Sequence, residues 1–443
     1  MNKREIINIL YIISFPVYGI GLYFSAARSP SAGYLISITP HLLILLFYSI
    51  DLLYRGEFEF KINIYYFLMG SFILSSIASL FVALHKGLPE SGILLMSTKS
   101  LELIVPFNAF VVFIIYNYEK KNLLWLTLLS LSLLLIINLI GFFILHLSNE
   151  VHSIEGRINF PFLDSFYSGA SLLAIINLIL LYYLKRTWND PMRFGLIMCY
   201  FIFNLALFFQ INSRLTIIVL IVVMGLFFLK LMRLRGIYLF SMFTIPILLS
   251  SGAIMFKAVQ MPGLSMLLQR VDVEDVTTFN GRAFLWKDAM DWLLYDQQGL
   301  VWGNGYKGHY FLGLISDVAK LWNEKDPYHM HLHSSSMEIM VAQGLVFFLV
   351  FAILFYRVYR YFREQNEIGT EEGAFLPLVL FLLFLMQVDT FLYLDNMGFV
   401  FFSLLVAKIA IKEKKLKDSF IENTKISGMF QLKSLFSRNS ITS

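Results

Sequence analysis

The sequence predicts an all-α polytopic membrane protein, on the basis of its composition, its long apolar runs and the placement of its basic residues. Of its 443 residues, 58% are hydrophobic and only 15% are charged, whereas a soluble domain is roughly half apolar and a quarter charged. A soluble fold could not hide this much apolar surface, so lipid is the expected solvent. An outer-membrane barrel is excluded, because its strands would alternate polar and apolar residues.

About twelve apolar segments approach the roughly 20 helical residues that are needed to cross the hydrocarbon layer. They lie at residues 6–24, 34–54, 62–84, 93–115, 123–147, 166–184, 194–211, 215–232, 237–256, 338–360, 374–394 and 396–411. The first run has a basic start, but no small-residue cleavage site follows it. We therefore expect a retained first span rather than a signal peptide.

The basic residues predict the orientation of these spans. With a cytoplasmic N-terminus, the inside segments hold most of them, including Lys3, Arg4, Arg55, Lys61, Lys120, Lys121, Lys185, Arg186, Arg193, Lys230, Arg233, Arg235, Arg357, Arg360, Arg363 and the Lys-rich tail. The short outside loops hold only Arg28, Lys86, Arg157 and Arg214. Both termini are therefore expected in the cytoplasm.

Four regions follow from this topology. Spans one to nine occupy residues 1–256, an extracytoplasmic loop 257–337, spans ten to twelve 338–411, and a basic cytoplasmic tail 412–443. Within the loop, GRAFLWKDAMDWLLY and HYFLGLISDVAKLW have the pattern of amphipathic helices, which either lie in the membrane interface or pack on the outer end of the bundle. The single cysteine excludes an internal disulfide and a cysteine-based metal site.

Three histidines, His329, His331 and His333, alternate just before the tenth span. Ser335 and Glu338 have the spacing of a capping box, which predicts a helix start here. The positive end of that helix would keep His333 neutral, able to accept a proton, and would attract a phosphate. The alternatives are a polar residue without a chemical role or a metal ligand. No carboxylate or cysteine completes a metal-binding set in sequence, so no metal site is expected.

Arginines are rare on the outside, and three of them are candidates for binding an anion. Arg214 falls in a connection of about three residues, so it lies at or just above membrane depth, where a charge is costly and usually functional. Arg157 and Arg282 lie in outside loops. The arginine side chain offers a planar, permanently charged fork that fits phosphate, and snorkelling to the interface is the alternative.

Two further features lie near the outer face. Lys99, at the outer end of the fourth span, is expected either to form an internal ion pair or to face a phosphate. GNGYKG (303–308), which contains Tyr306, offers backbone N–H groups to a phosphate or forms a turn between two helices. No nucleotide-binding glycine motif faces the cytoplasm, and the cell exterior offers no nucleotide sugars. Chemistry in the outer loop therefore needs a substrate that arrives already activated, such as a lipid-linked diphosphate.

These residues resemble the O-antigen ligase and polymerase superfamily of bacterial inner-membrane glycosyltransferases. That family has about twelve spans and a large periplasmic loop between spans nine and ten. The loop motif matches, in order, at Gly281, Arg282, Trp286, Gly303, Gly305, His333, Met337, Gly344 and Leu345. Upstream matches are Ser213 with Arg214, and Arg157 with Phe160 and Pro161. The sequence departs at Ser334, where the family has an asparagine, and this puts the family role of that side chain in doubt.

The resemblance implies a metal-independent, inverting transfer from an undecaprenyl-diphosphate-linked glycan donor, without a cofactor, at the periplasmic face of the inner membrane. His333 would take the proton from the acceptor hydroxyl. Arg214 and Arg282 would bind the diphosphate and offset the charge on the leaving group, with Arg157 assisting. His331, Tyr306 and Lys99 would contact the substrate.

The main functional hypothesis is a polymerase that joins lipid-linked repeat units, because the departure at Ser334 and the 16% aromatic content indicate a divergent family member. The alternatives are a ligase that moves the finished chain onto lipid A-core and an enzyme that transfers glycan to protein. The alternative hypothesis from a different functional class, a transport protein rather than an enzyme, is a flippase or transporter of the same lipid-linked sugars. Expected partners are the bilayer, the donor, a glycan or lipid A-core acceptor, and flippase and chain-length regulator proteins, but no nucleic acid.

Overall fold

The computed structural model describes residues 2–27, 29–55, 63–118, 122–147, 158–163, 165–232, 234, 236–250, 282–321, 324–365, 370–394 and 396–412. Regular structure in these residues is helical, with no strand. The long elements are α1 (Lys3–Ala27), α2 (Pro30–Arg55), α3 (Ile64–His85), α4 (Ile93–Asn117), α5 (Leu123–Leu139), α6 (Phe166–Arg186), α7 (Pro191–Ile211), α8 (Arg214–Phe228), α17 (Ser335–Glu364) and α18 (Glu371–Leu385).

Shorter elements complete the described residues. A π-turn η1 (Ile140–Ile144) extends α5, and α9 (Gly236–Leu239), η3 (Phe240–Thr244) and α10 (Ile245–Ser250) follow one another directly. The outer loop contains α14 (Arg282–Asp291), η4 (Trp292–Asp296), α15 (Gly308–Phe311), α16 (Ser316–Leu321) and the 3₁₀ turn η5 (Pro327–His329). Residues 397–412 form a last helix.

Each of the twelve predicted spans overlaps a helix in the described part of the chain. Eight helices there are long and apolar enough to cross a membrane, namely α1 to α4, α5 with η1, α6, α7 and α17. The chain is therefore an all-α polytopic membrane protein, as the composition predicts. The exact number of spans, the division into four regions and the sidedness of the termini stay predictions.

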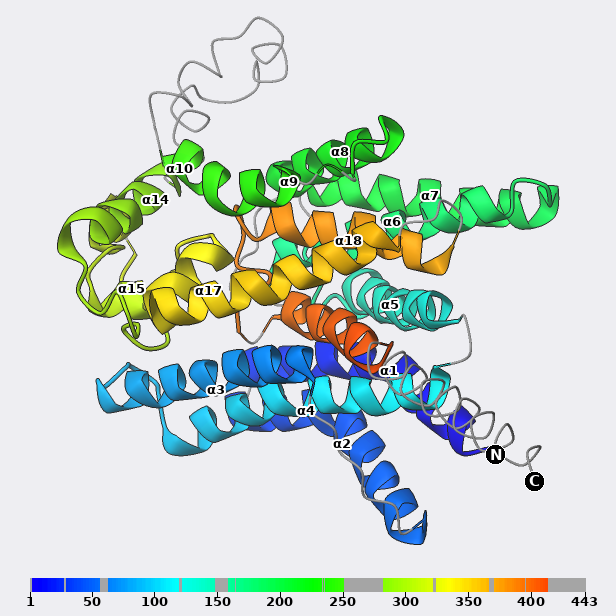
Figure 1. Ribbon diagram of the computed structural model, residues 1–443, viewed down its shortest axis with the longest axis horizontal. Coiled ribbons are helices and arrows are strands. Elements are labelled where there is room, and N and C mark those ends of the chain that lie inside the picture. Colours follow the sequence, from blue (N-terminus) through cyan, green and yellow to red (C-terminus); the bar gives the residue numbers. More distant parts are fainter. Residues whose placement is uncertain are drawn as a thin grey trace, which may run out of the picture.

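The helices form two groups that α5 and α17 join, α5 by packing on α1 and α6 (Figure 1). In one group α1, α2, α3 and α4 pack against each other, and in the other α6 contacts α7, α8 and α18. Helix α17 packs on α3 and on α18, and residues 373–383 of α18 are all buried. Helices α14 and α15 lie at one end of the bundle, opposite the end where α1 begins. We call the end that carries α14 and α15 the loop end.

The eleventh predicted span, 374–394, is wrong in its second half. Helix α18 ends at Leu385, and residues 386–394 are not helical. Non-helical backbone at membrane depth needs partners inside the protein, and α17 provides them. The Asp389 carbonyl accepts from Ser335 N at 2.9 Å, and the Met386 carbonyl accepts from Ser336 N at 3.3 Å. Hydropathy alone did not locate this break, because the non-helical segment is still mostly apolar despite Gln387, Asp389 and Thr390.

The predicted capping box is also wrong, and the start of α17 shows why three serines occur there. Ser334 is the N-cap, and its Oγ accepts from Met337 N at 3.4 Å. The next two hydroxyls bind the segment after α18: Ser335 Oγ donates to the Asp389 carbonyl at 2.7 Å, and Ser336 Oγ donates to Gln387 Oε1 at 2.8 Å. Buried hydroxyls need such partners, so the serines fasten α17 to this segment.

The outer-loop sequences are helical, but not as predicted throughout. Leu285, Ala289 and Trp292 of the expected apolar face are buried and Leu293 is partly buried, so this helix packs on the bundle. The second predicted helix, 309–322, is divided into α15 and α16, because Gly313 between them has a φ of +71°.

Helix α17 is broken at Gly344, where φ is +79° and ψ is 172°. The break exposes backbone groups that residues 300–305 satisfy. Asn304 N and Gly305 N donate to the Val341 and Ala342 carbonyls at 2.9 and 3.0 Å, and Leu345 N donates to the Leu300 carbonyl at 2.7 Å. The approach is so close that a Cβ on Gly344 would lie 2.4 Å from the Val301 carbonyl oxygen. The loop and the broken helix therefore interlock.

Replacing Gly344 by alanine should lower the apparent melting temperature of the purified protein, with a loss of at least about 2 kcal/mol, because a side chain there meets backbone and the positive φ adds strain. Gly225→Ala is the matched control, since nothing lies within 4 Å of a Cβ added inside α8. It should be neutral or stabilising by up to about 1 kcal/mol. Equal melting temperatures for the two variants would contradict the interlock.

Candidate functional site

His333 lies at the loop end, directly before the N-cap of α17, which agrees with its predicted place before a helix N-terminus. Its φ is +51°, an uncommon conformation for histidine that costs energy and is concentrated at functional sites. The ring of His333 lies 4.0 Å from that of His331 at 70°, and 6.3 Å from that of Tyr167, measured between centroids. His329 instead packs on Tyr328, with ring centroids 4.1 Å apart.

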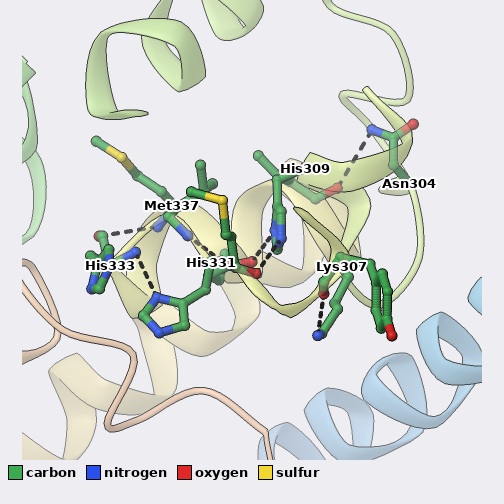
Figure 2. A network of polar contacts seen from close by, with 12 residues as sticks. Asn304, Lys307, His309, His331, His333 and Met337 are labelled. Carbon is green, nitrogen blue, oxygen red and sulfur yellow. Dashed lines mark hydrogen bonds and ion pairs between the residues drawn. The ribbon is translucent and has the colours of Figure 1, made fainter. Parts of the chain in front are cut away.

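His331 has a defined tautomer. The backbone N–H of His333 donates to its Nδ1 at 3.3 Å (Figure 2), and an atom that accepts this bond carries no proton. Burial lowers the pKa of His331 to about 4, and the positive Arg282 acts in the same direction, whereas Glu338 opposes the shift. At neutral pH the ring is therefore uncharged with its proton on Nε2. It can donate a hydrogen bond but is a poor base.

A buried pair, His309 and Glu338, fixes the segment that carries these histidines. His309 Nδ1 lies 2.8 Å from Glu338 Oε2, and its Nε2 lies 3.0 Å from the Met330 carbonyl (Figure 2). The other carboxylate oxygen accepts from Leu332 N at 2.6 Å. Because a carbonyl only accepts, Nε2 carries a proton, and a further proton lies between Nδ1 and the carboxylate. The His309–Glu338 pair therefore binds this segment at two points, the Met330 carbonyl and the Leu332 N–H, and we call the pair the clamp.

Arg282 begins α14, and only 4% of it is exposed. One guanidinium nitrogen donates to the Val388 carbonyl at 3.2 Å, and the group lies 4.8 Å from the centroid of the Tyr167 ring. The Tyr167 ring therefore neighbours both Arg282 and His333. Four residues further along, Trp286 Nε1 donates to the Leu332 carbonyl at 2.9 Å. Helix α14 is therefore tied both to the segment after α18 and to the histidine segment.

Among the described residues, Arg214 makes no contact with this cluster. Arg214 begins α8 after a two-residue connection in which Asn212 has a φ of +55°. Its side chain is exposed and has no hydrogen bond or ion pair within the described ranges. Arg157 lies outside the described residues, as does Gly281 of the loop motif. Their roles stay predictions.

Lys99 and Tyr306 contact each other, with Lys99 Nζ donating to the phenol oxygen at 3.1 Å. Tyr306 is buried and stacks on Tyr393 at 6.1 Å. The glycine-dense loop is a turn, because its Asn304, Gly305 and Tyr306 N–H groups all donate to carbonyls of the protein. They do not form a phosphate cradle. In the part of the chain that the structure describes, no three His, Cys, Asp or Glu residues gather as metal ligands.

Sequence reasoning missed three participants, namely Tyr167, the His309–Glu338 clamp and the backbone of 386–389. The clamp joins residues 29 apart, and a single sequence carries no signal for such a contact. The aromatic residue at the start of the sixth span was a visible signal for Tyr167, since it lies at the same predicted outer face as His333.

Residues 199–352 match the family model described as O-antigen ligase. The matched segment begins within α7 and ends within α17, so it contains Arg214, Arg282, His333 and the interlocked glycines Gly303 and Gly344. Comparison with curated proteins and with solved structures gave no significant match. The family match agrees with the resemblance found in the sequence.

Glu338→Ala should destabilise the protein by about 2–5 kcal/mol, because His309 and the Leu332 N–H would lose a buried acceptor. Glu338→Gln should cost less. Its amide oxygen can still accept from Leu332, and its NH₂ can donate to a neutral His309. Melting temperatures in detergent test this order, and a Gln variant as unstable as the Ala variant would contradict the clamp.

The stability of the protein should fall as pH is lowered from about 6.5 to about 4. His331 has a folded-state pKa of about 4 against an ordinary value of 6.5, so the unfolded state binds the extra proton in this window. The full effect is about 3 kcal/mol. Comparing wild type with His331→Asn at pH 7.5 and pH 5 isolates it. The variant should lose less stability on acidification, and parallel losses would contradict the shift.

Proposed function

We propose that this chain, as a member of the O-antigen ligase and polymerase superfamily, is a polymerase that joins undecaprenyl-diphosphate-linked oligosaccharide repeat units at the periplasmic face of the inner membrane. The observation that carries the proposal is the placement of Arg282 and His333 against one ring, Tyr167, at the loop end. A permanent cation and an imidazole are thereby held together without a metal-binding cluster in the described ranges.

The reaction needs a base and an anion site. His333 removes the proton from an acceptor hydroxyl, whose oxygen attacks the anomeric carbon of the donor sugar. The bond from that carbon to the diphosphate breaks on the opposite face, which inverts the configuration and releases undecaprenyl diphosphate. Arg282 offsets the negative charge that grows on the departing oxygen, an effect that burial strengthens. Its guanidinium has five N–H donors, of which the bond to Val388 uses one.

His331 has a role distinct from that of its neighbour. Because its Nδ1 already accepts a hydrogen bond and its ring is neutral, it offers Nε2–H to an oxygen of the substrate. His333 is then the base of the pair. Arg214, Arg157, Lys99 and Tyr306 are proposed to bind the donor more peripherally.

A ligase that transfers the glycan to lipid A-core is the second candidate, favoured by the description of the matching family. The departure at Ser334 does not separate them. Serine and asparagine are both good N-caps, so this change conserves the observed role of the position.

The substrate test uses the purified full-length protein, a synthetic undecaprenyl-diphosphate repeat unit and no added metal. A ladder of longer lipid-linked products is expected. Product formation only after lipid A-core is supplied would overturn the polymerase in favour of the ligase. Absence of product with either acceptor would overturn the enzyme proposal and leave a flippase to be tested in proteoliposomes.

His333→Ala should lower the rate of transfer by about 10²–10⁴-fold, the usual contribution of a general base, while donor binding stays measurable. His331→Ala should mainly weaken substrate binding. Lys287→Gln is the control, since this exposed lysine on α14 pairs only with Asp291 in the described residues. Rates are compared for variants with wild-type melting temperatures. Normal turnover in a folded His333→Ala protein would contradict the base assignment.

A further inference from the structure

A cavity of about 380 Å³ lies where α6, α8 and α18 meet, and none of the candidate site residues lines it. Its walls are mainly apolar, with Leu178 from α6, Phe227 from α8 and Pro377 from α18 among them. The only charged side chains in the lining are those of Lys185 and Lys230. The volume is within the range of ligand pockets in proteins, roughly 300–1,000 Å³.

The backbone at Lys230 is unusual for this residue type. It follows the end of α8 with a φ of +58°, and Leu231 N closes the turn on the Leu226 carbonyl at 2.9 Å. This is the position that glycine normally takes after a helix, because other residues adopt the left-handed conformation at a cost. A lysine here indicates that its side chain contributes something other than the turn.

The two lysines also lack a carboxylate. Within the described part of the chain, Lys185 and Lys230 have neither a hydrogen bond nor an ion pair. Two described carboxylates at the start of α18 are engaged elsewhere: Glu371 accepts from Leu124 N at 2.6 Å, and Glu372 pairs with Lys412 at 3.5 Å. Two ammonium groups without a partner among the described residues therefore border an apolar cavity. Their complement is a molecule with an anionic head and an apolar chain.

We propose that this cavity binds an anionic phospholipid, with an acyl chain between α6, α8 and α18 and the phosphate between Lys185 and Lys230. Thr370, the N-cap of α18, also lines the cavity, so the polar start of that helix borders the same space. Basic pockets between membrane helices bind anionic headgroups in this way. The inference is independent of the glycosyl transfer proposed above.

The test titrates the full-length protein in detergent with phosphatidylglycerol or with phosphatidylcholine of the same acyl chains, and counts bound lipids by native mass spectrometry. Phosphatidylglycerol should fill one saturable site that phosphatidylcholine occupies much more weakly. The double variant Lys185→Gln, Lys230→Gly should bind phosphatidylglycerol about thirtyfold more weakly. Because glycine suits the backbone at 230, this variant keeps the fold.

Arg193→Gln is the matched control, since Arg193 is an exposed basic residue of α7 paired with Asp190. Its affinity for phosphatidylglycerol should equal that of wild type, and Lys185→Arg should preserve binding. Equal affinity of the wild type for both lipids would overturn the headgroup assignment. Unchanged binding of phosphatidylglycerol by the double variant, with a wild-type melting temperature, would overturn the site.

Discussion

The break in α17 at Gly344 is the constraint on which the candidate site depends. A helix that is interrupted among packed membrane helices must find partners for its released N–H and C=O groups inside the protein. Residues 300–305 provide them, at contacts so close that only glycine fits at 303 and 344. This pairing sets the position of the chain that follows, and α15 then carries His309 to Glu338. Gly303 and Gly344 therefore help to position the histidine segment without contacting it.

The same end of α17 combines two kinds of polar contact. The serines at 334–336 anchor the helix start to the non-helical segment after α18, and that segment in turn receives the guanidinium of Arg282 through the Val388 carbonyl. The clamp of His309 and Glu338 holds residues 330–332 from the other side. The positive φ of His333 costs conformational energy, and such a conformation persists only where surrounding contacts hold the backbone in place, as these do. The result is a rigid support for His333 and a neutral donor, His331, beside it.

Much of the fold could be predicted from the sequence, because hydropathy reports directly on helices in lipid. The place of His333 before a helix was predicted from the spacing of Ser335 and Glu338 just before an apolar run, even though Ser334 and not Ser335 is the N-cap. The breaks could not be predicted this way. Residues 386–394 are still mostly apolar, although they include Gln387, Asp389 and Thr390, and the glycine at 344 interrupts an apolar run without changing its hydropathy. Contacts between distant residues, such as His309 with Glu338 or Arg282 with Tyr167, also leave no trace in a single sequence.

The most direct measurement is a cryo-electron microscopy structure of the full-length protein in a lipid nanodisc with undecaprenyl diphosphate. We expect diphosphate density in contact with the guanidinium of Arg282 and within hydrogen-bonding reach of His331, with His333 facing the space beside it. Diphosphate bound elsewhere, with Arg282 still donating only to Val388 and packed on Tyr167, would contradict the central claim that these residues form the donor site.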